Sequence, residues 1–127
     1  MGTSQNIAKC VPNYIFEFSE EIDRTKPAHV NFPPGAYHGS DVPYLFDLKG
    51  RIAPFDETQV RFSEKVIKYW TNFAAKGNPN GSGLPTWSKG TVRKGYGLSL
   101  DSDGRGIRPV NLVKGHQSEF WDELYPQ

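Results

Sequence analysis

The chain has 127 residues, of which 36% are hydrophobic and 13% aromatic, and this composition is typical of a globular domain rather than of a disordered segment. Its 15 basic and 14 acidic residues give a formal net charge of +1, so charge offers no reason to expect nucleic acid or an anionic membrane as a partner. No apolar run approaches the ~20 residues that cross a bilayer, and we therefore expect no membrane span.

The N-terminus carries few signals. The first nine residues are polar and lack the apolar core of a signal peptide. One cysteine, Cys10, excludes an intrachain disulfide, and no motif around it indicates a nucleophile. If Met1 is the true start, we expect a soluble, cytoplasmic chain; if the chain was cut from a secreted precursor, its compartment stays open.

A strand is predicted over residues 12–18, PNYIFEF. Tyr14, Phe16 and Phe18 alternate with other side chains, so the three rings share one face of the strand. That aromatic face needs a covering layer. Residues 19–34 are first acidic, then basic, then proline-rich, and they are predicted to form a loop. Ser40 or Asp41 can cap a short helical turn through residues 43–45.

The clearest predicted element is a helix over residues 57–76. Asp56 suits the N-cap position and Gln59, three residues later, completes a capping box. Gly77 lies at the natural end, and Pro79 prevents continuation. One face carries large apolar side chains at helical spacing: Phe62, Val66, Tyr69 and Phe73.

The remaining residues predict fewer regular elements. Residues 78–90 are turn-rich, residues 96–100 suggest a short strand, residues 101–106 a turn, and residues 116–124 a short helix. No repeat or linker divides the chain. An isolated strand would leave two unpaired edges, which folded proteins avoid. The small number of predicted strands therefore favours a single partial domain over 1–127 that is part of a larger fold.

Three segments resemble, in order, the C-terminal region of the type-B carboxylesterase and cholinesterase family of α/β-hydrolases. They are GAYHGSDVPYLF at 35–46, YWTNFAAKGNPNGSGLPTW at 69–87, and HQSEFWDEL at 116–124. The resemblance covers nearly the whole chain. It implies an α/β fold class: the C-terminal fragment of an α/β-hydrolase fold, with one or two strands, the long helix at about 57–76 and a short C-terminal helix.

The resemblance also implies a role for His38, which stands in the G-A-x-H-G segment where the family has its catalytic histidine. The family hydrolyses carboxylic esters through a serine acyl-enzyme, and its histidine is the general base. Gly35 and Gly39 flank His38, which suits a tight loop. Asp41 follows the histidine by three residues, so we interpret Asp41, with Gly39, as supporting the histidine from behind or capping the next helical turn, rather than as the triad acid.

The other parts of that machinery are missing from the sequence. No serine lies in the G-x-S-x-G pattern of a nucleophile elbow; Ser82, for example, lies in NGSGL. No glycine-rich stretch resembles the family's oxyanion loop. His29, His38, Asp41 and His116 have no recognised metal-ligand spacing. We therefore expect no nucleophile, no metal and no cofactor in this chain.

Three functions remain open. The first is the C-terminal portion of a carboxylic ester hydrolase, inactive alone, with an upstream esterase fragment supplying the serine and the acid, and a small-molecule ester as substrate of the complete enzyme. The alternative is a non-catalytic interaction module derived from the esterase fold. An independent small hydrolase is the least favoured, because a preorganised site supplies much of the rate.

A partial domain should expose apolar surface that its missing neighbours would cover. We expect unusual exposure of either the aromatic strand face, Tyr14, Phe16 and Phe18, or the helix stripe at Phe62, Val66, Tyr69 and Phe73. Burial of both to core levels would argue against a partial domain.

Overall fold

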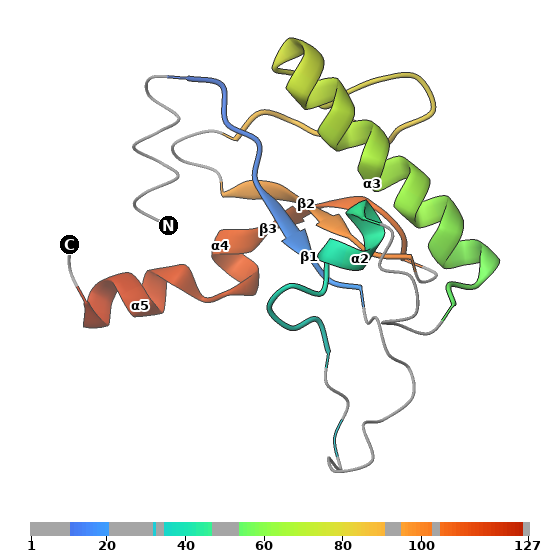
Figure 1. Cartoon of the computed structure of the whole chain (residues 1–127). Coiled ribbons are helices and arrows are strands. Elements are labelled where there is room, and N and C mark those ends of the chain that lie inside the picture. The colour runs from blue at the N-terminus through green and yellow to red at the C-terminus, as the bar shows by residue number, and fades with distance from the viewer. Residues whose placement is uncertain are drawn as a thin grey trace.

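The computed structural model describes residues 11–20, 32, 35–46, 54–90, 95–102 and 105–125. Within these ranges the chain forms three strands and four helices (Figure 1). In chain order they are β1 (Phe16–Phe18), α2 (Val42–Leu45), α3 (Glu57–Lys76), β2 (Tyr96–Leu100), β3 (Arg108–Asn111), α4 (Leu112–Gly115) and α5 (Ser118–Leu124).

The strands form one sheet in the order β1-β2-β3. β1 and β2 are parallel, with Phe16 opposite Leu98, and the chain between them carries α2 and α3. β3 runs antiparallel to β2, with Pro109 opposite Leu98. In Figure 1, α3 lies above the strands, and α4 and α5 lie below them. The predicted α/β class is therefore confirmed, with helices on both faces of a small mixed sheet.

The long helix α3 has the predicted bounds, Glu57–Lys76. Asp56 Oδ1 accepts hydrogen bonds from the backbone N–H groups of Thr58 and Gln59, both at 2.8 Å, and Gln59 Oε1 accepts from Asp56 N at 3.1 Å. This is the capping box. Gly77 closes the helix in the left-handed conformation, φ 66°, which glycine adopts without steric cost.

Of the two surfaces named as alternatives for exposure, the helix stripe is the one that is largely buried. Phe62, Val66 and Tyr69 are at most 4% exposed, and only Phe73, at 49%, faces solvent. The stripe packs into one core cluster with Tyr44, Trp87, Leu98 and Leu100. β2 and the turn-rich segment after α3 pack against the stripe, and the sequence pattern alone did not show these contacts.

The aromatic face of β1 is the surface that stays incompletely covered. Phe16 is 39% exposed, and Tyr14 and Phe18 are only partly buried. Phe18 packs against Tyr44 and Phe62, with ring centroids 5.6 and 6.0 Å apart. The two surfaces are thus not both buried to core levels, which agrees with a partial domain.

Two elements were not expected. β3 contains Pro109, which removes a ladder donor and is tolerated because β3 lies at an edge of the sheet. α4 is only four residues long. The predicted first strand shortens to Phe16–Phe18, and the predicted C-terminal helix begins at Ser118 rather than at residue 116. Most of the loop predicted over 19–34 lies outside the described residues.

Because Tyr69 is buried, we expect the free energy of unfolding to depend on pH in the alkaline range. Burial raises the pKa of Tyr69 from 10.0 to about 12, and its hydroxyl donates to Pro85 O at 2.6 Å. The unfolded chain releases this proton first as pH rises. The stability that Tyr69 contributes is therefore fully present below about pH 10 and is lost between about pH 10 and 12, at up to ~1.4 kcal/mol per pH unit.

Urea unfolding at a series of alkaline pH values measures this slope. Tyr69→Phe should flatten it, whereas Tyr125→Phe, at a residue that is 68% exposed, should leave it in place. An equal slope in the unmodified protein and in Tyr69→Phe would contradict the assignment.

Candidate active site around His38

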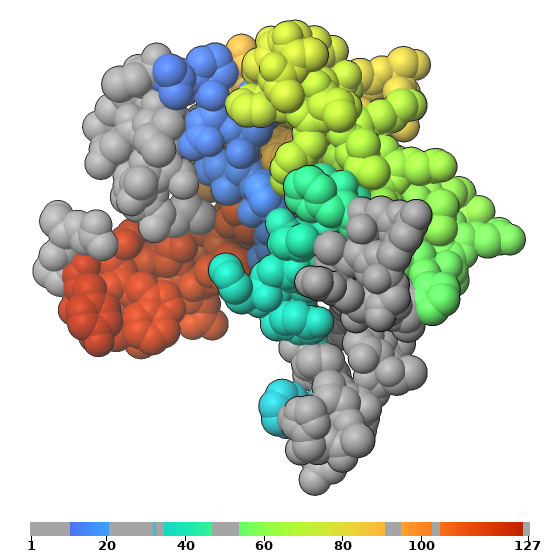
Figure 2. Space-filling view, in the orientation of Figure 1, coloured from blue at the N-terminus to red at the C-terminus, as the bar shows by residue number. Residues whose placement is uncertain are grey.

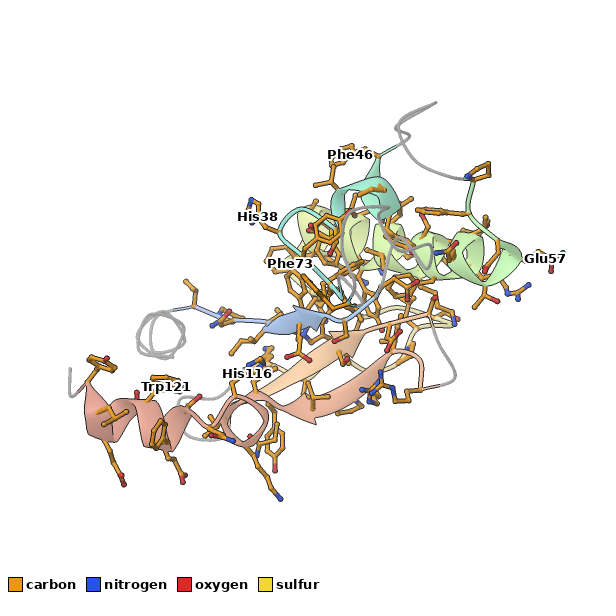
Figure 3. All side chains as sticks on the ribbon, turned by 90° about the horizontal axis from the view of Figure 1, so that it is seen from below. His38, Phe46, Glu57, Phe73, His116 and Trp121 are labelled. Carbon is orange, nitrogen blue, oxygen red and sulfur yellow. The ribbon has the colours of Figure 1, made fainter. Side chains whose placement is uncertain are left out.

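His38 lies in a tight turn just before α2. Ser40 N donates to Tyr37 O at 3.0 Å, and this bond encloses His38 and Gly39 as the two central residues. Gly39 has φ +80°, the value that a type II turn requires at its third residue. His38 is exposed, and Figure 3 shows its side chain pointing away from α2. The turn therefore presents the imidazole to solvent.

α2 fixes this turn at the carboxyl end of β1. Val42 N donates to Gly39 O at 3.1 Å, so the helix follows the turn directly. Tyr44 is fully buried, stacks on Phe55 at a centroid distance of 4.4 Å, and packs against Phe18, the last residue of β1. The carboxyl ends of strands are where open α/β sheets place their sites. His38 thus lies where the fold type favours chemistry.

A buried carboxylate links α2 to the sheet. Glu20, which follows β1, is 1% exposed and accepts three hydrogen bonds. Its partners are Ser102 N at 2.6 Å, Ser102 Oγ at 2.8 Å and the Tyr44 hydroxyl at 3.0 Å. Gln59 Nε2 in turn donates to the Tyr44 hydroxyl at 3.1 Å. We call these four residues, Glu20, Tyr44, Gln59 and Ser102, the Glu20 network.

The Glu20 network is a feature that sequence reasoning missed. Glu20 begins an acidic run at the start of the predicted loop, where an exposed charge is the usual expectation. Its partners Tyr44 and Ser102 lie 24 and 82 residues away in sequence. No local pattern signals such a contact. The network joins the ends of β1 and β2 to the helices α2 and α3, and so holds the His38 turn in place.

Asp41 lies at the N-cap position of α2, but it does not cap the helix. Its backbone is helical, φ −79° and ψ −24°, and its side chain makes no capping hydrogen bond. A capping carboxylate needs an extended backbone at this position to reach the free N–H groups. The capping role expected of Asp41 is therefore not formed. Ser40, the other candidate cap, is buried at 2% exposure.

The structure does not bring the other histidine near His38. His116 lies after α4, and its Nε2 contacts Glu17 Oε2 on β1. Glu17 alternates with Phe16 and Phe18, whose rings face α3, so the His116 contact lies on the opposite face of the sheet. His29 falls outside the described residues. Among the described residues, no group of three or more potential metal ligands is present.

The family model described as "Carboxylesterase family" matches residues 2–121. The chain belongs to the carboxylesterase family. Among curated relatives, it is 33% identical over 123 residues to human cocaine esterase and 36% identical over 126 residues to the rat pyrethroid hydrolase Ces2e. Each match covers 91% of this chain and 20% of the relative.

A solved structure gives the same answer for the fold. The chain superimposes on an esterase from Clostridium hathewayi with a TM-score of 0.69 at 18% identity. The match covers 91% of this chain and 22% of the other. The chain therefore spans about a fifth of the length of these relatives. Within the described ranges, none of its helices has the length and apolarity that crossing a bilayer requires.

His38 presents an exposed imidazole on its turn. Among the described residues, no side chain hydrogen-bonds to His38, and a general base needs its nucleophile within hydrogen-bond reach. An exposed imidazole on a fixed turn can accept a proton from a hydroxyl brought to it.

The positive φ of Gly39 predicts how much a side chain at this position would lower the stability of the protein. A Cβ at Gly39 would meet no atom within 4 Å, so the cost of Gly39→Ala comes from its backbone φ of +80° alone. We expect a loss of about 1 kcal/mol in unfolding free energy. Gly115→Ala is the matched control, because Gly115 is equally open but has ordinary φ in α4. Similar urea midpoints for both variants would contradict the strained turn.

Proposed function

We propose that this chain supplies the general base, His38, of a serine carboxylic ester hydrolase. In this proposal the nucleophilic serine, the triad acid and the oxyanion hole lie in the part of the esterase fold that this chain does not span. The substrate is a carboxylic ester. The chain alone is inactive.

One observation carries the proposal: the exposed His38 turn at the carboxyl end of β1. Glycine at the third position of the turn and the buried Tyr44 just after it fix the imidazole at this edge of the sheet. A positioned base contributes typically 10²–10⁴-fold to a rate. A fixed turn with an exposed imidazole leaves His38 accessible to a hydroxyl from another part of the fold.

The chemistry follows from what His38 can and cannot do. Its neutral imidazole takes the proton of a serine hydroxyl as that oxygen attacks the ester carbonyl, and later returns the proton to the leaving alcohol. The acid orients the imidazole, and backbone N–H groups hold the developing oxyanion. The sequence contains no G-x-S-x-G segment. Two chain segments must therefore meet before any ester is cleaved.

The first experiment tests the chain alone. The purified 127-residue protein should not hydrolyse p-nitrophenyl acetate above the buffer rate, because no serine lies in an elbow. Turnover that disappears in His38→Ala would overturn the prediction of inactivity and favour an independent small hydrolase.

The second experiment supplies the missing part. In a chimera, this chain replaces the C-terminal segment that it matches in the Clostridium hathewayi esterase. The chimera should hydrolyse p-nitrophenyl acetate, and His38→Ala should abolish that turnover. A folded chimera without activity would count against the proposal and favour a non-catalytic interaction module.

A further inference from the structure

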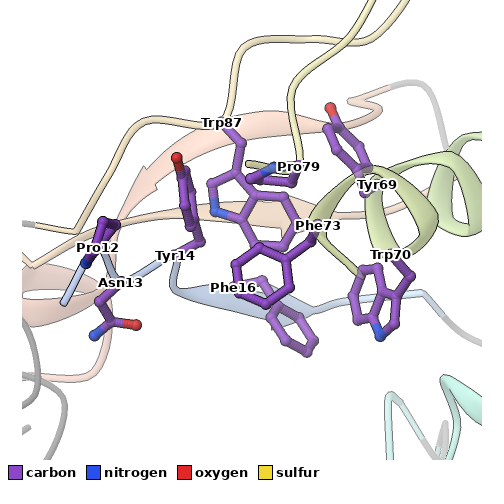
Figure 4. Close-up of a pocket in the computed structure, with 9 residues that line it drawn as sticks. All are labelled: Pro12, Asn13, Tyr14, Phe16, Tyr69, Trp70, Phe73, Pro79 and Trp87. Carbon is purple, nitrogen blue, oxygen red and sulfur yellow. The ribbon is translucent and has the colours of Figure 1, made fainter. Parts of the chain in front are cut away.

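The two halves of α3 line different hollows. The second half lines an apolar one of about 230 Å³, whose walls are mostly aromatic rings, Tyr69, Trp70 and Phe73 among them (Figure 4). The first half lines another, of about 210 Å³, together with the turn between β2 and β3. Figure 2 shows the start of α3, in green, on the side of the molecule away from α5, in red. The 210 Å³ hollow differs in chemistry, because charged side chains line it.

These charged side chains reach the 210 Å³ hollow from one face of α3. Thr58, Arg61 and Lys65 follow one another at helical spacing, and all three are exposed. Phe62, on the same face, is 4% exposed and gives the hollow an apolar floor. Arginine and lysine lay their stems on such a floor and keep their charged heads in water. We call this hollow, with Thr58, Arg61, Phe62 and Lys65 on its α3 side, the basic pocket.

The carboxylates beside the basic pocket already have partners. Asp101, in the turn, is 3% exposed and lies 3.4 Å from Arg105 Nη2 and 3.9 Å from Arg108 Nη1. Glu20 accepts three buried hydrogen bonds, two of them from Ser102 of the pocket wall. Neither carboxylate is therefore left to balance the cations of α3.

The cations of α3 are less fully paired. Arg61 Nη1 contacts Glu57 Oε2 at 3.4 Å, but the two side chains are 63% and 92% exposed, so water screens the pair. Among the described residues, no carboxylate pairs with Lys65. Arg61 and Lys65 lie four residues apart on the helix, where like charges repel. An anion bound between them would relieve that repulsion.

Size and donors specify the anion. The volume lies below the ~300–1,000 Å³ of pockets for drug-sized ligands, so the occupant is small. The N–H groups of Thr58 and Gln59 already donate to Asp56, so binding depends on side chains rather than on the helix terminus. A phosphate group offers three acceptor oxygens and roughly two negative charges. It matches two cations and a hydroxyl better than the two oxygens of a carboxylate do.

We propose that the basic pocket binds a small phosphate monoester. Arg61 and Lys65 hold its charge, and the Thr58 hydroxyl donates to a third oxygen. Phe62 and the partly buried Ile107 supply apolar contact for the carbon side of the ester.

The basic pocket is separate from the candidate active site. In Figure 3, Glu57, at the start of α3, and His38 lie well apart. Binding in the basic pocket needs no ester turnover, so it is tested, and can fail, independently of the proposed function.

Titration of the 127-residue chain with inorganic phosphate and with methyl phosphate, followed by amide NMR, tests the pocket. We expect shifts concentrated in the first two turns of α3 and at Gly106 and Ile107, with a Kd on the order of 1 mM for methyl phosphate. Acetate at equal ionic strength should bind at least about tenfold more weakly, because it has one charge and two oxygens. Equal shifts with chloride at the same ionic strength would show screening alone and overturn the proposal.

Variants of the chain assign the donors. Lys65→Gln and Arg61→Gln each remove one exposed cation and should each weaken binding of methyl phosphate at least about fivefold. Lys68→Gln is the matched control, because Lys68 is exposed on α3 but lines neither hollow. Glu57→Gln should instead strengthen binding about twofold, because it frees Arg61. Equal weakening by Lys65→Gln and Lys68→Gln would rule out the site.

Phosphate monoesters also occur as lipid headgroups, and vesicles separate the two sources. The chain is sedimented with phosphatidylcholine vesicles that contain or lack phosphatidic acid. Binding of methyl phosphate without cosedimentation would identify a soluble ester as the ligand. Cosedimentation that requires phosphatidic acid and is lost in Lys65→Gln would identify the headgroup. Absence of both kinds of binding would overturn the proposal.

Discussion

His38→Ala is expected to lower kcat of the esterase chimera by on the order of 10⁴-fold, because the serine loses its proton acceptor while the rest of the site is kept. The substitution lies at an exposed side chain, so it should not unfold the protein. The measurement is turnover of p-nitrophenyl acetate at saturating substrate, with unfolding in urea recorded for both proteins.

His116→Ala is the matched control for this loss. His116 contacts Glu17 on the opposite face of the sheet from α3, and it is also exposed. Its loss should change kcat by less than about threefold, on the scale of a surface substitution. Equal losses in the two variants would show that His38 is not the base.

Glu20→Ala is expected to reduce the unfolding free energy by about 3 kcal/mol, the largest stability effect that we predict. The substitution removes the acceptor for three donors: Ser102 N, Ser102 Oγ and the Tyr44 hydroxyl. All three hydrogen bonds are buried. Buried donors without partners carry their full desolvation penalty. Urea unfolding of the 127-residue chain measures the loss.

Two further variants separate the network from simple loss of charge. Glu64→Ala removes an exposed carboxylate of α3 and should change stability by less than about 0.5 kcal/mol. Glu20→Gln keeps one acceptor oxygen but brings an NH₂ group to a place where Ser102 and Tyr44 already donate. It should fall between the other two variants. A Glu20→Ala variant as stable as Glu64→Ala would rule out the network as a stabilising element.

The parts of the fold that the sequence predicted have local causes. The bounds of α3 follow from the Asp56 capping box, the apolar repeat and Gly77, all within one stretch of chain. β2 at Tyr96–Leu100 also has the predicted bounds. Such elements carry their own start and stop signals, so one sequence is enough to place them.

The parts that were missed depend on distant residues. Three residues of the α3 stripe are buried because Leu98 and Leu100 of β2 pack into the same core cluster. The apolar pattern of the helix does not show which strand it packs against. β3 depends on pairing with β2 rather than on its own pattern, in which Pro109 argues against a strand. The burial of Glu20 depends on Ser102, 82 residues away.

The site was predicted by a different route. Gly39 predicts a turn from its residue type, but the role of His38 came from the resemblance of residues 35–46 to a family segment. The structure adds the type II geometry at Gly39 and the anchor at Tyr44. No serine of the sequence lies in a G-x-S-x-G pattern, so no local pattern predicts a nucleophile.

The parallel pairing of β1 with β2 has a consequence for synthesis. Phe16 cannot meet Leu98 until the chain between them has left the ribosome. At roughly 5–20 residues per second, β1 waits on the order of 4–16 s before its backbone can pair with β2. Contacts so distant in sequence also form slowly. Nascent chains should therefore engage holding chaperones through residues 12–18, and α3 should fold before the sheet exists.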